Sequence, residues 1–290
     1  MNLTIAGLSK RYGSKAALQD LNLTLEPGIV GLVGPNGSGK TTLLRILATT
    51  LAPSTGTINW DGRDVIRDPD RLRREMVYMP QQFAGYPHLT AFEFLVYLAE
   101  LRGVARGDAR RAATQALETM GLAGDAKRQL GAFTPGMLQR LGIGYVVSTD
   151  ARVVLLDEPT AGLDPFARSL LCDALLRTAR ERLVVICTHI FDDLELIADR
   201  IVALRSGRIA AHATRDAFIE RARGRVWEIE TDAYPDALDG RVTAQRREGD
   251  RSLRLRVVHA FEPQPGARAV TPSLQDACAW LEMHEDGIAC

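Results

Sequence analysis

The chain has 290 residues, enough for one large domain and a smaller one. Its 36 basic and 36 acidic side chains cancel, so the charge gives no support to nucleic-acid binding, which a basic excess would favour. No apolar run reaches the roughly 18 residues that span a bilayer, and the first residues lack the layout of a signal peptide. None of the four cysteines forms a C-x-x-C pair. We therefore expect a cytosolic globular protein without a zinc or disulfide framework.

The first 33 residues predict short strands. Residues 21–25 alternate between apolar and polar side chains with period two, and residues 26–28 are typical of a turn. The apolar run at residues 28–33 predicts a buried strand.

Residues 34–41 fit the pattern G-x-x-x-x-G-K-[ST] at every fixed position. In such a loop the backbone N–H groups point at phosphates, Lys40 brings a positive charge, and the Thr41 hydroxyl can ligate Mg²⁺. Residues 42–47 predict a helix whose N-terminus faces the phosphates. The predicted nucleotide contacts are Gly34, Pro35, Asn36, Gly37, Ser38, Gly39, Lys40, Thr41 and Thr42. The segment predicts that the chain binds a nucleoside triphosphate, against the alternative of a chance glycine-rich turn.

Further elements follow along the chain. Residues 57–60 predict a strand that enters a turn at Asp61-Gly62, and residues 76–79 predict another strand, which Pro80 ends. A helical period runs from about residue 90 to 122 and again over residues 138–147.

Residues 153–156 predict a buried strand that ends in two acids. Asp157 is placed to hold Mg²⁺, directly or through water, and Glu158 can polarise an attacking water as a general base. Two solvated acids at a strand end are the alternative. The phosphate-binding loop upstream favours the metal and base roles.

A helix at residues 165–180 and a strand at residues 183–187 continue the alternation. Strands that alternate with helices predict an α/β domain with a parallel sheet.

The composition changes near residues 222–224. Residues 226–230 and 253–257 alternate as strands do, and a helix is predicted after Pro272. We interpret residues 225–290 as a small α+β extension.

Taken together, these motifs resemble the nucleotide-binding subunit of an ATP-binding-cassette (ABC) transporter over about residues 1–222. The resemblance implies a P-loop NTPase fold, in which helices flank a mixed sheet and a helical subdomain spans about residues 85–150. It also implies an ATPase that binds ATP and Mg²⁺.

The resemblance assigns roles to further residues. Tyr12 matches the aromatic residue that stacks on adenine, although a strand-edge aromatic is the alternative. Gln81 matches the glutamine that reaches Mg²⁺ and the water, with Gln82 as the neighbouring alternative. Asp164 ends a segment like the loop that signals between subunits. His189 matches the switch histidine that contacts the γ-phosphate.

Residues 133–140 resemble the family's signature segment, with one departure. The commoner form is Leu-Ser-Gly-Gly; here Thr134 keeps the hydroxyl and Gly136 keeps the second glycine. Pro135 replaces the first glycine and removes one N–H. Thr134 can cap a helix that begins at Pro135, so the helix N-terminus still offers the Gly136 N–H to a phosphate. We expect the substitution to affect signalling more than binding.

The resemblance implies a dimer, homodimer or heterodimer, that sandwiches ATP between the phosphate-binding loop of one subunit and the signature segment of the other. It places the chain at the cytoplasmic face of the membrane, where residues 83–103 contact transmembrane permease subunits, and residues 83–90 resemble export-type subunits. We therefore predict an ATP-hydrolysing subunit that energises an exporter, with no nucleic-acid partner.

Two alternatives stay open. A soluble ABC ATPase acting on nucleic acid or ribosomes usually carries coiled-coil insertions or a second cassette, and neither is visible. A regulatory subunit with little turnover is favoured slightly by Pro135 and opposed by the intact Glu158 and His189.

Overall fold

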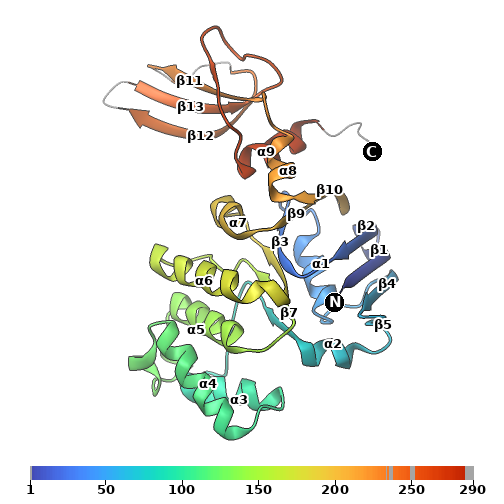
Figure 1. Ribbon diagram of the computed structural model, residues 1–290, viewed down its shortest axis with the longest axis vertical. Helices are drawn as coiled ribbons and strands as arrows, with labels where there is room; N and C mark the ends of the chain where they lie inside the picture. Colours follow the sequence, from blue (N-terminus) through green and yellow to red (C-terminus); the bar gives the residue numbers. More distant parts are fainter. Residues whose placement is uncertain (1, 233, 235–237, 249–251, 285–290) are drawn as a thin grey trace.

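A central sheet of six strands carries the buried centre of the molecule (Figure 1). The computed structural model describes residues 2–232, 234, 238–248 and 252–284. In sheet order the strands are β10 (Arg208–Thr214), β9 (Arg200–Arg205), β3 (Gly28–Val33), β8 (Leu183–Cys187), β7 (Val153–Asp157) and β6 (Met76–Met79). Neighbouring strands are parallel except β10, which is antiparallel to β9. β7 and β8 are buried at every residue, as in sheets covered on both faces. The predicted α/β fold with a mixed sheet is confirmed.

A second, antiparallel sheet lies beside the first, with helix α1 (Lys40–Leu47) in contact with both. Its strands, in order, are β2 (Lys15–Leu25), β1 (Leu3–Tyr12), β4 (Thr55–Trp60) and β5 (Arg63–Asp64), and helix α2 (Pro69–Glu75) follows. Leu43 and Leu47 of α1 join one apolar cluster with β1, β2 and one face of β7 and β8. This packing fixes the N-terminus of α1, where the phosphate-binding loop ends.

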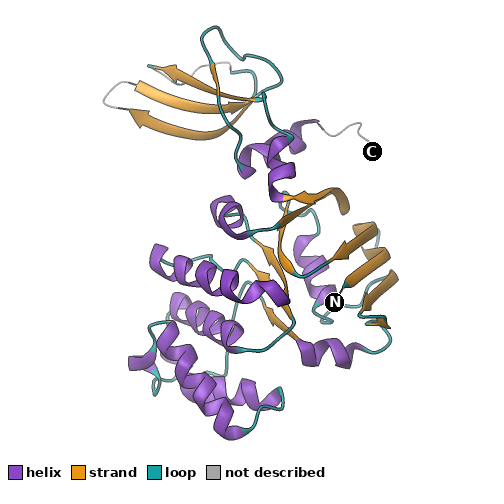
Figure 2. Cartoon of the chain, in the orientation of Figure 1, coloured by secondary structure: helices purple, strands orange, loops and turns teal. Residues whose placement is uncertain are grey.

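Helices cover the other face of the central sheet and extend beyond it, as Figure 2 shows in purple. They are α3 (Ala91–Leu101), α4 (Arg106–Thr119), α5 (Pro135–Ser148), α6 (Pro165–Thr178) and α7 (Phe191–Ile197), with 3₁₀ turns at Ala123–Asp125, Leu130–Ala132 and Ala179–Glu181. The predicted helical stretch from about residue 90 to 122 is divided into α3 and α4. Gly103 follows α3 with a left-handed φ of 83°, which ends the helix. None of the helices in the described part of the chain has the length and apolarity that a bilayer span requires.

The C-terminal residues form a third sheet, which helix α9 (Leu274–His284) joins to the core (Figure 1). After helix α8 (Arg215–Glu220), the strands in sheet order are β12 (Arg241–Glu248), β13 (Ser252–Val258), β11 (Val226–Thr231) and β14 (Arg268–Ala269). The predicted α+β character of this extension is confirmed; residues 285–290 lie outside the described residues.

One apolar cluster crosses the predicted boundary between the core and the extension. Leu274 and Cys278 of α9 belong to the same buried cluster as Phe218 of α8 and Ile197 of α7. The extension therefore covers apolar side chains of the core. The division into a nucleotide-binding unit at residues 1–222, with its helical subdomain, and an extension at residues 225–290 stays a prediction.

Candidate active site

The phosphate-binding loop connects the end of β3 to the start of α1, as its pattern requires. Gly34 and Gly39 have φ angles of 140° and 107°, which favour glycine strongly. A Cβ atom on Gly34 would lie 2.1 Å from the carbonyl oxygen of Leu204, and one on Gly39 would lie 2.7 Å from that of Ala17. Both glycines are therefore required by close backbone approaches as well as by φ.

A pocket of about 330 Å³ opens above this loop. Its lining residues are Tyr12, Lys15, Ala17, Asn36, Gly37, Gly39, Lys40, Thr41, Thr42, Gln81, Asp157, Glu158 and Cys187. Five separate parts of the chain thus meet at one place. Of the predicted loop contacts, Gly34, Pro35 and Ser38 lie outside the pocket, and the buried Ser38 hydroxyl has no hydrogen-bond partner among the described residues.

Two lysines face the pocket from different elements. The Lys40 ammonium donates to the carbonyl oxygens of Gly34 at 2.7 Å and Pro35 at 3.0 Å, so it bends back over the loop. Lys15, which sequence reasoning missed, pairs with Tyr12 across the β1–β2 turn. The spacing of Tyr12 and Lys15 around a two-residue turn was a signal for this neighbour.

Tyr12 and Gln81 lie on the pocket wall. Tyr12 is 49% exposed, and the Lys10 ammonium lies 5.3 Å from the centroid of its ring. An exposed ring beside a phosphate-binding loop can stack on a planar base. Gln81, which follows β6, lines the pocket, and Gln82 lies outside it.

Asp157 ends β7 inside the pocket. Its carboxylate is buried, and burial raises its pKa, although hydrogen bonds with Cys187 and Thr41 and the charge of Lys40 oppose the rise. The carboxylate and the Thr41 hydroxyl therefore lie side by side. Oxygen ligands of this kind suit a hard divalent cation.

Glu158 takes an unusual backbone conformation at the edge of the pocket. Its φ is 52°, in the left-handed region, and its N–H donates to the carbonyl oxygen of Cys187 at 2.7 Å. Its carboxylate contacts His189, whose ring Nδ1 lies 2.7 Å from Oε2. His189 itself lies outside the pocket, next to this carboxylate.

The signature residues lie outside the pocket of their own chain. Thr134 caps α5 by accepting the Met137 N–H at 3.3 Å, and Pro135 is the first helical residue, as predicted. Asp164 caps α6 by accepting the Ala167 N–H at 2.9 Å. The fold therefore does not bring Thr134, Gly136 and Asp164 to the loop residues of the same chain.

Comparison with known proteins identifies the family. The family profile described as ABC transporter matches residues 18–161. The daunorubicin resistance ATP-binding protein DrrA3 of Streptomyces coeruleorubidus is 35% identical over 216 residues, which are 74% of this chain and 68% of that protein. The chain belongs to the ATP-binding subunits of ABC transporters. This ABC subunit is accordingly an ATPase that binds ATP.

Other relatives differ in how much of their length the subunit covers. The linearmycin resistance ATP-binding protein LnrL of Bacillus subtilis is 30% identical, across 77% of this chain and 72% of that protein. The human retinal-specific phospholipid-transporting ATPase ABCA4 is 34% identical across 69% of this chain, which spans only 9% of ABCA4.

Solved structures share the fold of the ABC subunit. An ATP-binding subunit of an ABC transporter is 27% identical, with a TM-score of 0.70, and the match covers 76% of this chain and 93% of that one. A dimeric ATP-binding cassette bound to ADP and Pi is 24% identical, with a TM-score of 0.68 and coverage of 73% and 98%. The latter likeness concerns the fold alone.

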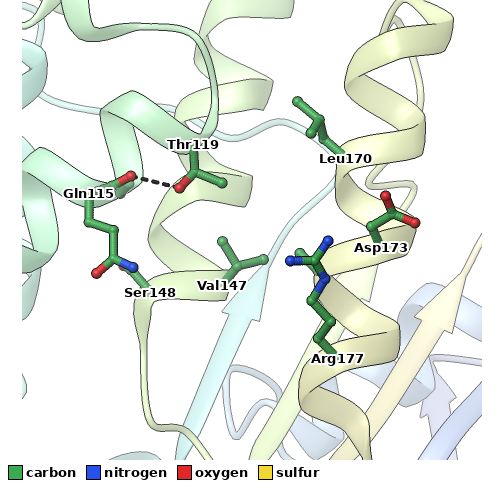
Figure 3. A pocket seen from close by; sticks show the side chains of 9 residues that line it. Gln115, Thr119, Val147, Ser148, Leu170, Asp173 and Arg177 are labelled. Atoms are coloured by element: carbon green, nitrogen blue, oxygen red, sulfur yellow. Dashed lines mark hydrogen bonds between the residues drawn. The ribbon is translucent and has the colours of Figure 1, made fainter.

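A second hollow of the ABC subunit, of about 270 Å³, lies between α4, α5 and α6 (Figure 3). Gln115, Thr119 and Ser148 line one side of it, and Asp173 and Arg177 line the other. It shares no lining residue with the pocket above the phosphate-binding loop. Tyr12, the phosphate-binding loop, Gln81 and the acids at the end of β7 therefore line the pocket above the loop and not this second hollow.

Proposed function

We propose that this subunit binds Mg²⁺–ATP in the pocket above the phosphate-binding loop and hydrolyses it to energise an exporter. The observation that carries the proposal is the convergence of Lys40 with the adjacent acids Asp157 and Glu158 on one pocket, from two segments far apart in the sequence. They supply a cation for the phosphates, an oxygen ligand for a metal and a base for water.

The residues of the pocket fit Mg²⁺ bound together with a phosphate ligand. Among the described residues no group of three or more His, Cys, Asp or Glu side chains forms a metal site. Mg²⁺ commonly takes one or two protein oxygens and completes its shell with substrate phosphates and water. Thr41 and Asp157 would hold it, with Gln81 nearby, and the ion would neutralise charge on the transferred phosphoryl group.

Glu158 accepts a proton from the attacking water. The water oxygen then forms a bond to the γ-phosphorus while the bond to the bridging oxygen breaks, which releases ADP and phosphate. Lys40 offsets the negative charge that develops on the phosphate oxygens. His189 orients the Glu158 carboxylate through the 2.7 Å contact and faces the γ-phosphate.

The second half of each site comes from another ATP-binding subunit, in a homodimer or a heterodimer. Thr134 and Pro135 at the start of α5 are exposed. The N-terminus of this 14-residue helix favours a phosphate through its free N–H groups, including that of Gly136. Asp164, which is exposed at the start of α6, faces the same partner.

The membrane partner binds at residues 83–103, and the subunit works peripherally at the cytoplasmic face. Tyr86 and Leu101 are 56% and 66% exposed there, and Tyr86 stacks edge-on against Phe94 and Tyr97. An exposed aromatic patch of this kind marks a protein contact. The resistance proteins among the relatives support an export direction.

The test is the Glu158→Gln variant, purified with its permease. We expect ATP affinity to stay unchanged and turnover to fall by about a hundredfold or more, because an amide cannot accept the proton. Glu118→Gln, at an exposed position on α4, is the matched control and should hydrolyse ATP at the wild-type rate. Turnover of Glu158→Gln within a few-fold of wild type would show that Glu158 is not the base.

A further inference from the structure

Gln139 links α5, the helix that begins in the signature segment, to the backbone of the proposed base Glu158 by a hydrogen bond. It lies on α5 and is only 7% exposed. Its side-chain amide donates from Nε2 to the carbonyl oxygen of Pro159 at 2.9 Å and to that of Glu158 at 3.2 Å. A buried polar group with two backbone partners ties the position of one segment to that of the other.

Glu158 is a residue whose conformation depends on such ties. A left-handed φ is rare for a residue other than glycine and persists where the surroundings hold it. The N–H of Glu158 is held by the Cys187 carbonyl, its carboxylate by His189, and its carbonyl by Gln139 and the Ala161 N–H. Gln139 is thus one of four groups that fix this residue.

The same face of α5 contacts the loop at a second point. Gly136 precedes Gln139 by three residues, so the two share a helix face. A Cβ atom on Gly136 would lie 3.5 Å from the carbonyl oxygen of Gly162. The first turns of α5 therefore bond to the loop at residues 158–162 through Gln139 and lie close to it at Gly136, while the tip at Thr134 and Pro135 stays exposed.

We infer that Gln139 is a positioning residue that couples the signature segment to the base of the same subunit. The inference rests on the proposed function, in which the tip of α5 faces the nucleotide held by the partner subunit. When that nucleotide binds the tip, it holds α5 in position. The Gln139 amide then holds the carbonyl groups of Glu158 and Pro159 in position through its two hydrogen bonds. Hydrolysis at one site therefore depends on occupancy of the other, through a contact within one chain.

The experiment uses the full subunit in complex with its permease. Gln139→Met keeps the length of the side chain without the N–H donor, and Gln139→Glu replaces the donor by an acceptor. Each removes both hydrogen bonds from Nε2 and should lower kcat by about tenfold. ATP affinity should stay within about twofold, and the Hill coefficient for ATP should fall toward unity. Gln115→Met, at an exposed position on α4, is the matched control and should change none of these.

A double variant distinguishes positioning from packing. Because Gln139 acts through Glu158, adding Gln139→Met to Glu158→Gln should not lower the residual single-turnover rate further. A second tenfold loss in that background, or wild-type kcat in both Gln139 variants, would overturn the inference while leaving Glu158 as the base. Wild-type turnover of Glu158→Gln alone would overturn the proposed function, and the inference with it. The thermal midpoint of each variant identifies a folding defect, and Gln139→Glu decides the question if Gln139→Met does not fold.

Discussion

The ring Nδ1 of His189 lies 2.7 Å from Oε2 of Glu158, and the same oxygen lies 3.3 Å from the His189 backbone nitrogen. The His189 side chain is 73% exposed, whereas that of Glu158 is 13% exposed. The exposed imidazole and the backbone N–H of one residue thus each contact the nearly buried Glu158 carboxylate. His189 and the proposed base are therefore a structural pair, so we expect a substitution at His189 to change the orientation of the Glu158 carboxylate.

We expect His189→Ala to lower turnover by about tenfold or more, because the carboxylate loses a charge-assisted contact that orients it. ATP affinity should change little, since His189 lies outside the pocket. Steady-state hydrolysis and equilibrium nucleotide binding measure the two quantities separately. A parallel loss of affinity and turnover would mean that His189 acts mainly through its γ-phosphate contact and not through the orientation of the base.

The two lysines of the pocket should differ in their contribution to ATP affinity. Lys40→Ala removes the cation that the loop itself holds, and we expect affinity to fall by about 10- to 100-fold. Lys15 is exposed, so water and salt screen it, and Lys15→Ala should weaken binding by about threefold at most. Titration at low and high salt measures both effects. Equal losses of ATP affinity in the two variants would show that Lys15 and Lys40 contribute equally to phosphate binding.

The sequence predicts those parts of the site that depend on one continuous segment. The glycines of the phosphate-binding loop, the acids at the end of β7 and the cap of α5 at Thr134 are local patterns, because backbone geometry within a few residues sets them. Short apolar runs likewise predict four strands of the central sheet, β3, β6, β7 and β8, whereas β9 and the half-exposed β10 are not predicted.

Contacts between distant segments escape this reasoning. Lys15 reaches the pocket because the β1–β2 turn lies beside α1, and Gln139 reaches Glu158 because α5 packs against the loop after β7. The burial of Leu274 against the core also depends on how α9 folds back. Tertiary packing decides each of these; the spacing of Tyr12 and Lys15 is a local signal for Lys15, and no local pattern of residues encodes the other two contacts.

The signature segment should depend more on its cap than on its proline. Thr134→Ala removes the side chain that accepts the Met137 N–H, which costs about 1 kcal/mol of stability, and it removes the hydroxyl proposed to face the nucleotide. Pro135→Gly should retain or raise ATPase activity, because it restores one N–H at a position that needs no helical partner. Both are measured in the transporter complex, with thermal midpoints alongside. Normal hydrolysis by Thr134→Ala would favour an asymmetric pair in which the partner's signature segment supports turnover.

In the C-terminal extension, Asp276 is fully buried on α9 and accepts several hydrogen bonds. Its carboxylate accepts two hydrogen bonds from the Arg256 guanidinium, at 2.7 Å and 2.9 Å, and one from the Thr243 hydroxyl at 2.6 Å. It also accepts hydrogen bonds from the backbone N–H and the hydroxyl of Ser273, at 2.8 Å each. Burial alone would raise the pKa of Asp276, but these bonds outweigh it and lower the pKa below its ordinary value of 3.8. The ionised carboxylate therefore stabilises the extension.

We expect Asp276→Asn to destabilise the protein by about 3 kcal/mol near neutral pH, because it leaves the Arg256 guanidinium without its buried partner. The folded pKa is lowered, so the stabilisation is complete above 3.8 and is lost as the pH falls through the lower folded value. The difference in free energy of unfolding between wild type and variant should therefore narrow on acidification, as denaturant titrations at several pH values would measure. ATP affinity should not change, because Asp276 lies outside the nucleotide pocket. A difference that is constant with pH would show that Asp276 acts by shape and hydrogen bonding alone, without its charge.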